Sequence, residues 1–80
     1  MINIKLLNKT SEQIRQCREK YGNYSSRHEF YGILKEEFNE LETEIFKKDV
    51  NFKRLEEEMI DCLTVLIKGY EDIISARNER

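Results

Sequence analysis

Apolar residues recur every three or four positions along most of this chain, and its 80 residues include no proline to interrupt the pattern. That spacing places the apolar side chains on one face of an α-helix. A capping box that begins at Ser26 predicts a helix that runs to Lys48, where cations favour a helix C-terminus. Asp49 or Asn51 can cap a further helix, whose apolar stripe continues to Ile74. The short link between the two predicts a long antiparallel helix hairpin.

The N-terminal part of the chain carries weaker signals. Apolar and polar residues alternate from Ile2 to Leu6, so we expect residues 1–9 to form an extended segment packed along the bundle. The sequence Thr10-Ser-Glu-Gln13 resembles a capping box and predicts a short helix that ends at Gly22.

A chain of this length makes a small core. A domain of 80 residues buries a limited fraction of its surface. The apolar residues of the last helix span roughly 200° of its circumference, more than one neighbouring helix covers. We therefore expect a single all-α domain over residues 1–80, a helical bundle built around the hairpin and completed by oligomerisation as a homodimer or homotetramer. Residues 76–80 are expected to fray.

Charge and composition argue against several classes of partner. The 14 basic residues are interleaved with 16 acidic ones, so a nucleic acid polymer is not expected to bind. No apolar run approaches the ~20 residues of a membrane span, and the N-terminal stretch is too short and polar for a secretion signal. We expect a cytoplasmic protein with no membrane partner. Cys17 and Cys62 lie far apart without a Cys-x-x-Cys pattern, which is typical of reduced core residues.

Acidic residues interrupt the apolar face of the first hairpin helix. On a helical projection, Glu37 and Glu44 fall inside the apolar arc and Glu40 falls at its edge. Buried carboxylates destabilise a fold unless something neutralises them. A bound cation can do so, and so can an arginine or lysine of a neighbouring subunit. The sequence leaves both possibilities open.

The second hairpin helix carries Glu58 and Asp61 on one flank, three residues apart. Glu40 and Asp61 lie at nearly the same sequence distance from the turn, so the hairpin brings the acids of both helices to one level. We expect four carboxylates to converge there, those of Glu37, Glu40, Glu58 and Asp61. An all-oxygen site suits Mg²⁺, with Mn²⁺ as a second candidate. The alternative is a solvated acidic face, because such pairs also arise by chance in an acidic chain.

The segment from His28 to Glu44, followed by Glu56-Glu-Glu-Met-Ile-Asp61, resembles the MazG-like branch of the all-alpha nucleoside triphosphate pyrophosphohydrolases. The pattern that carries the resemblance is Glu-x-x-Glu on one helix and Glu-x-x-Asp on the next. The resemblance implies a Mg²⁺-dependent enzyme that cleaves a nucleoside triphosphate between its α and β phosphates, releasing the monophosphate and pyrophosphate. It also implies that the metal ligands and catalytic residues are Glu37, Glu40, Glu58 and Asp61.

Three further side chains are candidates for substrate binding. Lys68 and Arg54 can contact phosphates, and Tyr31 can stack on a base. Each also has a structural interpretation without a ligand. Lysine and arginine side chains on a helix flank are usually solvated, and an aromatic side chain at helical spacing commonly packs in a core or an interface. Relatives often have another helix after the second motif, whereas this chain ends soon after Ile74. The alternative function is therefore a non-catalytic helical oligomer with a regulatory or partner-binding role.

Overall fold

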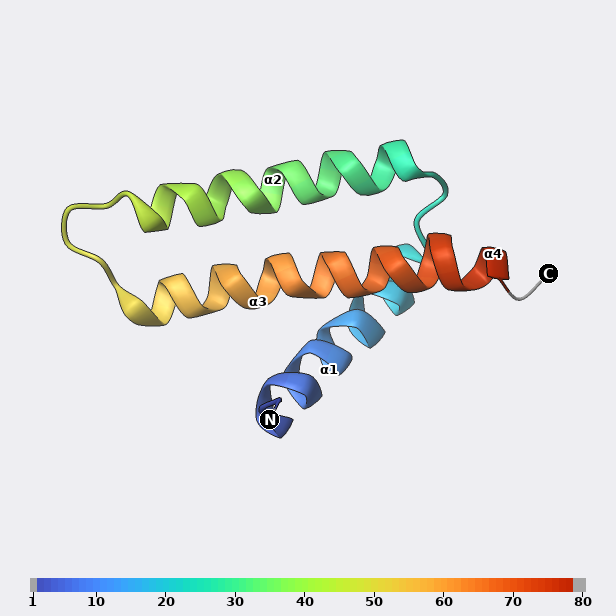
Figure 1. The fold of residues 1–80 in the computed structure, drawn as a ribbon, viewed down its shortest axis with the longest axis horizontal. Helices are drawn as coiled ribbons and strands as arrows, with labels where there is room; N and C mark the ends of the chain where they lie inside the picture. Colours follow the sequence, from blue (N-terminus) through green and yellow to red (C-terminus); the bar gives the residue numbers. More distant parts are fainter. Residues whose placement is uncertain (1, 79–80) are drawn as a thin grey trace.

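The computed structural model describes residues 2–78 of the chain, and within that range it contains helices and no strand (Figure 1). The all-α class expected from the sequence is therefore confirmed. In chain order the elements are α1 (Ile4–Tyr21), α2 (Arg27–Ile45), α3 (Phe52–Gly69), a π-helical turn η1 (Tyr70–Ser75) and α4 (Ala76–Asn78).

The hairpin of α2 and α3 forms the long body of the molecule. The two helices run antiparallel and side by side, and a short loop joins them (Figure 1). At the end away from that loop, the ring of Phe30 lies directly against Gly69, where an added Cβ atom would overlap it. A residue without a side chain at this point of α3 thus lets the two helices approach closely. None of the described helices is long and apolar enough to cross a bilayer.

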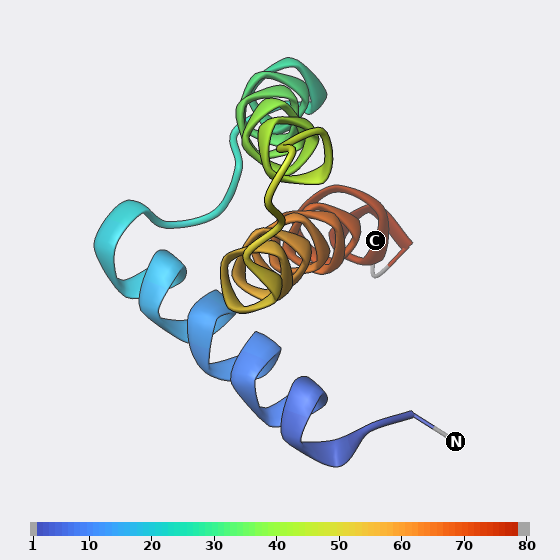
Figure 2. The same cartoon turned by 90° about the vertical axis from the view of Figure 1, so that its left-hand side faces the viewer.

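The first helix crosses the hairpin and packs against α3 (Figure 2). α3 therefore has neighbours on two sides within the same chain, which accounts for part of its wide apolar arc. The buried apolar residues are few, and they come from α1 and α3: Ile14, Ile60 and Val65. Such a small core agrees with the limited burial expected for a domain of this size.

α1 begins earlier than the sequence patterns predicted. Asn3 caps it, because the side-chain oxygen of Asn3 accepts a hydrogen bond from the Leu6 N–H at 3.1 Å. Thr10 lies inside the helix and is buried, and its hydroxyl donates to the Leu6 carbonyl oxygen at 2.8 Å. The extended segment predicted for residues 1–9 and the helix start predicted at Thr10 are therefore wrong over the described residues. The threonine hydroxyl is satisfied within the helix rather than at its end.

The starts of the hairpin helices follow the sequence more closely, although α2 ends at Ile45 and not at the predicted Lys48. Ser26 caps α2 by accepting the Glu29 N–H at 3.1 Å, and the Glu29 carboxylate accepts the Ser25 N–H at 3.0 Å. Asn51 caps α3 by accepting two backbone N–H groups, each at 3.1 Å. Gly22 ends α1 with a φ of 76°, in the region that favours glycine. The predicted cap at Ser26 is confirmed, and of the two candidates for the next helix, Asp49 and Asn51, Asn51 forms the cap.

The C-terminal part of the chain departs from a regular α-helix. α3 ends at Gly69, and η1 continues its path through Ile74. The tail that was expected to fray at 76–80 begins with the helical turn α4, while residues 79–80 lie outside the described part of the chain.

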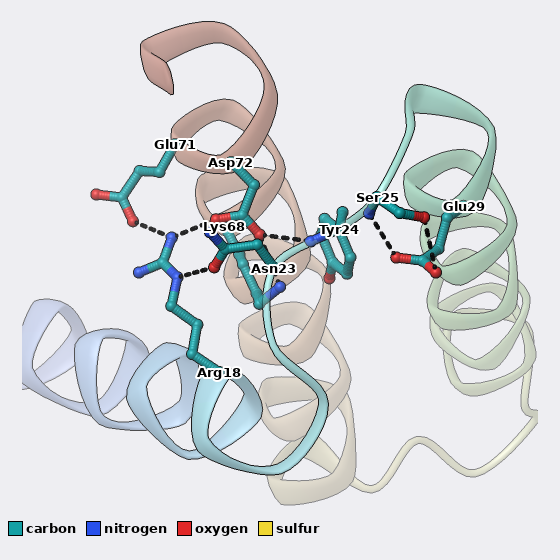
Figure 3. Close-up of polar contacts among 8 residues, drawn as sticks. All are labelled: Arg18, Asn23, Tyr24, Ser25, Glu29, Lys68, Glu71 and Asp72. Atoms are coloured by element: carbon teal, nitrogen blue, oxygen red, sulfur yellow. Dashed lines mark hydrogen bonds and ion pairs between the residues drawn. The ribbon is translucent and has the colours of Figure 1, made fainter. Parts of the chain in front are cut away.

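A group of charges around the buried carboxylate of Asp72 holds α1 to the end of the hairpin (Figure 3). Asp72 of η1 accepts from the Arg18 guanidinium at 2.7 Å and from the Lys68 ammonium at 2.7 Å. The backbone N–H of Tyr24 also donates to Asp72, at 3.0 Å. Burial alone would raise the pKa of Asp72, but these three donors outweigh it and lower the pKa. We call this group, Arg18, Tyr24, Lys68 and Asp72, the Asp72 clasp.

We expect Asp72→Asn to destabilise the protein by about 3–5 kcal/mol, because it leaves the Lys68 ammonium buried without its counter-charge. The matched control is Glu71→Gln, since Glu71 pairs with Arg18 at the surface and its side chain is 49% exposed. That control should change stability by no more than about 1 kcal/mol. Urea unfolding followed by circular dichroism measures both. Equal effects of the two variants would contradict the importance of the buried carboxylate.

Candidate metal centre

Three glutamates of the hairpin bring their carboxylates together. Glu37 and Glu40 lie one turn apart on α2, and Glu58 lies opposite them on α3. One oxygen of each carboxylate lies within 4.8 Å of one oxygen of the other two. Oxygens that share one octahedral Mg²⁺ ion at about 2.1 Å are at most about 4.2 Å apart. Small side-chain movements therefore suffice for these three residues, which we call the glutamate cluster, to hold one ion.

Two carboxylates of this cluster have oxygens that are buried and unsatisfied. The Oε2 atoms of Glu37 and Glu58 are shielded from solvent and have no hydrogen-bond partner among the described residues. Glu58 is 7% exposed as a whole residue. A buried carboxylate oxygen without a donor destabilises the fold, and most such atoms in native proteins have a partner. A cation between the glutamates would satisfy both atoms.

The electrostatics of the cluster also favour an added positive charge. Burial, followed by repulsion from Glu40, Asp61 and Glu58, raises the pKa of Glu37 to about 7. Burial and the adjacent Glu40 raise the pKa of Glu58, although the Arg54 guanidinium acts in the opposite direction. Burial likewise raises the pKa of Asp61, and a side-chain hydrogen bond from Gln13 opposes the change. Protons or a cation can relieve this repulsion.

Asp61 lies beside the glutamate cluster rather than within it. Its oxygens are not part of the set that falls within 4.8 Å. Asp61 and Glu37 instead line the same cavity of about 350 Å³, whose other wall consists of α1 residues that include Gln13 and Lys20. The structure therefore brings three of the four predicted ligands together and places the fourth at their edge.

Arg54 contacts acids of the hairpin. It lies 3.7 Å from Glu58 Oε1 and 3.6 Å from Glu44 Oε1. The Lys47 ammonium donates to Glu44 at 2.7 Å, and this hydrogen bond is the main cause that lowers the pKa of Glu44. Glu44 is therefore neutralised by cations of its own chain, whereas the sequence left open a cation from a neighbouring subunit. Arg54 joins this ion-pair group near the hairpin loop to Glu58 of the glutamate cluster. The Oε2 atom of Glu44 is also buried without a partner among the described residues.

The other two candidates for substrate binding lie in different surroundings. Lys68 is 1% exposed, pairs with Asp72, and lies 3.6 Å from the centre of the Tyr24 ring. It lines a cavity of about 520 Å³ together with Glu37, so its position is near the cluster although its charge is engaged. Tyr31 is 64% exposed and lines a different, apolar cavity with Phe38. The structure does not bring Tyr31 to the carboxylates.

The contribution of α1 to this centre was not expected from the sequence. The Thr64 hydroxyl on α3 donates to Gln13 Oε1 on α1 at 2.6 Å, beside Asp61. The one sequence signal for a role of Gln13 is its place next to Ile14, which belongs to the apolar stripe of the helix. Nothing in that spacing shows that α1 packs on α3 at this height.

Comparison with known proteins adds no relative to this description. No protein-family model matches the chain, and neither a curated protein nor a solved structure matches it. The arguments that follow therefore use the residues and geometry of this chain.

The raised pKa of Glu37 predicts how stability depends on pH in the absence of divalent cations. Between pH 4.5 and about 7 the native state binds the proton more tightly than the unfolded chain does, so stability should fall as pH rises through this window. Glu37→Gln removes the charge that destabilises the native state above this window. We expect it to raise the free energy of unfolding by about 1–2 kcal/mol at pH 8, after allowance for solvent screening, and to have little effect at pH 4.

The matched control for this measurement is Glu36→Gln, because Glu36 is the exposed neighbour on the same helix. Urea unfolding of the three proteins in EDTA at the two pH values gives the comparison. The same change in stability for both variants at pH 8 would contradict a specific effect of the buried carboxylate.

Proposed function

We propose that this chain is a Mg²⁺-dependent nucleoside triphosphate pyrophosphohydrolase of the MazG-like kind. The observation that carries the proposal is the convergence of Glu37, Glu40 and Glu58, with buried carboxylate oxygens on Glu37 and Glu58 that have no partner in the described part of the chain. Glu58 is buried, Glu37 half-buried and Glu40 exposed, and unpartnered carboxylate oxygens of this kind are expected where a cation completes the site. We expect the protein to act in the cytoplasm, where it would encounter a nucleotide substrate.

The donor set fits a hard divalent cation. All of its ligands are carboxylate oxygens, which suit Mg²⁺ or Mn²⁺ and disfavour softer metals. Glu37, Glu40 and Glu58 would hold the ion. When bound, the ion supplies electrostatic stabilisation of the phosphates during cleavage.

The cavities beside the cluster supply space for a nucleotide. The two cavities, of about 350 and 520 Å³, share five residues, so they form neighbouring parts of one cleft between α1 and the hairpin. The shared residues are Cys17, Tyr21, Glu37, Thr64 and Val65. Their volumes lie in the range of small-molecule sites. A triphosphate bound at the cluster would thus extend its nucleoside along α1.

In the reaction, a water oxygen forms a bond to the α-phosphorus, and the bond from that phosphorus to the bridging oxygen breaks. Pyrophosphate leaves with the electron pair of that bond. The proton lost by the water passes to a carboxylate of the centre, and Asp61 is the candidate because it faces the cavity outside the cluster.

A second candidate function is a non-catalytic homo-oligomer, and the exposed apolar face of the hairpin favours it. Leu66 lines two apolar cavities on this face, one with Tyr31 and Phe38 and the other with Tyr70 and Ile74. All five are large apolar or aromatic residues with at least 41% of their surface exposed. Faces of this kind are typical of subunit contacts. A homodimer or homotetramer is compatible with either function.

We expect the wild-type protein with Mg²⁺ to release pyrophosphate from at least one member of a panel of canonical and modified nucleoside triphosphates. Glu40→Gln should lower this rate at least about a hundredfold, the scale expected when one electrostatic group of an active site is lost. Glu42→Gln, an exposed acid on the same helix, is the control and should keep the wild-type rate. No release from any substrate, with a melting temperature unchanged by Mg²⁺ or Mn²⁺, would favour the non-catalytic alternative.

We also expect the wild type to sediment as a dimer or tetramer and Leu66→Glu to sediment as a monomer, because a charge at the centre of the apolar face opposes its burial. Phe46→Glu is the control, since Phe46 is 80% exposed just after α2 and lines neither of these two cavities. Sedimentation velocity distinguishes the species. A monomeric wild type would refute the proposed assembly.

A further inference from the structure

Gln13 of α1 bonds to α3 next to the glutamate cluster and lines the same cavity as Asp61. Its Oε1 accepts the Thr64 hydroxyl at 2.6 Å, and Thr64 is 4% exposed. Because that oxygen is engaged, the amide nitrogen is the end available to Asp61, a carboxylate that can only accept when ionised. Asp61 precedes Thr64 by three positions and therefore shares its side of α3. One glutamine from another helix thus bonds to Thr64 and lies beside Asp61 in the wall of one cavity.

The position of Asp61 suits an indirect role at the cation. Asp61 lies outside the set of three close carboxylates, yet it lines the same cavity as Glu37. Mg²⁺ and Mn²⁺ in such sites usually keep several water molecules, which donate hydrogen bonds to nearby acceptors. Residues that orient such contacts commonly change metal affinity 10-fold to 100-fold when they are removed.

We propose that Gln13 is a positioning residue, which holds Asp61 at the rim of the glutamate cluster so that its carboxylate binds the water molecules retained by the cation. The inference rests on the cation site of the proposed function and deepens it. It assigns α1 a role in cation affinity, in addition to covering α3.

The test measures Mn²⁺ affinity of the full chain by electron paramagnetic resonance, so it does not depend on turnover. Gln13→Met keeps the length of the side chain and removes both hydrogen-bonding ends. We expect Gln13→Met and Asp61→Asn each to weaken Mn²⁺ binding about tenfold. The double variant should bind no more weakly than Asp61→Asn alone, because Gln13 acts through Asp61.

Gln16→Met is the matched control. Gln16 lines the same cavity but donates to Glu12 on its own helix at 3.2 Å, so its replacement should leave Mn²⁺ affinity unchanged. Thr64→Val should weaken Mn²⁺ binding as Gln13→Met does, whereas Thr64→Ser keeps the hydroxyl and should retain wild-type affinity. Thr64→Val also keeps the inference testable if Gln13→Met fails to fold.

Each outcome separates the inference from the proposed function. Wild-type Mn²⁺ affinity in both Gln13→Met and Thr64→Val overturns the positioning role and leaves the hydrolase proposal standing. Additive losses in the double variant overturn it too, because they indicate a general loosening of α1. A wild type that binds Mn²⁺ but releases no pyrophosphate overturns the hydrolase alone. A wild type that does not bind Mn²⁺ overturns both.

Discussion

The buried carboxylate of Asp72 decides where α1 lies. Its two oxygens receive hydrogen bonds from three different segments: the guanidinium of Arg18 at the end of α1, the N–H of Tyr24 in the following connection, and the ammonium of Lys68 on α3. A buried ion pair is tolerated when further partners stabilise its charges, and here the Asp72 oxygens accept three hydrogen bonds while the Lys68 ammonium also lies over the Tyr24 ring. Because the clasp holds α1 across α3, α1 forms a wall of the cavity beside the glutamate cluster.

The buried acids of this small fold differ in what neutralises them. Asp72 and Glu44 each have a lysine ammonium at 2.7 Å, and both have lowered pKa values. Glu37 and Glu58 have raised pKa values, and Arg54, at 3.7 Å, is the cation that lies near Glu58 among the described residues. Glu37, Glu44 and Glu58 each have a buried Oε2 atom without a partner there, so the difference lies in the close cation that Glu44 has. The chain thus supplies its own cations to one group of acids, while the other lacks a comparable close partner. This contrast is the physical reason to expect a cation from solution at the glutamate cluster.

Much of the hairpin could be predicted because its signals are local. The caps at Ser26 and Asn51 each involve residues within a few positions, and both are formed as expected. The register that brings Glu37 and Glu40 level with Glu58 follows from helix rise and a short loop. Asp61 lies just outside the glutamate cluster. Its carboxylate instead lies in the cavity beside Gln13 of α1, and the position of α1 could not be predicted from the hairpin alone.

The sequence by itself determined two capped helices in an antiparallel hairpin and the meeting of three glutamates, since helical period and capping act over a few residues. Tertiary structure alone decided that α1 crosses α3 and that Lys68 is engaged by Asp72. Arg18 and Asp72 are separated by 54 positions. Contacts over such separations depend on how whole helices pack, and no short sequence pattern specifies that packing.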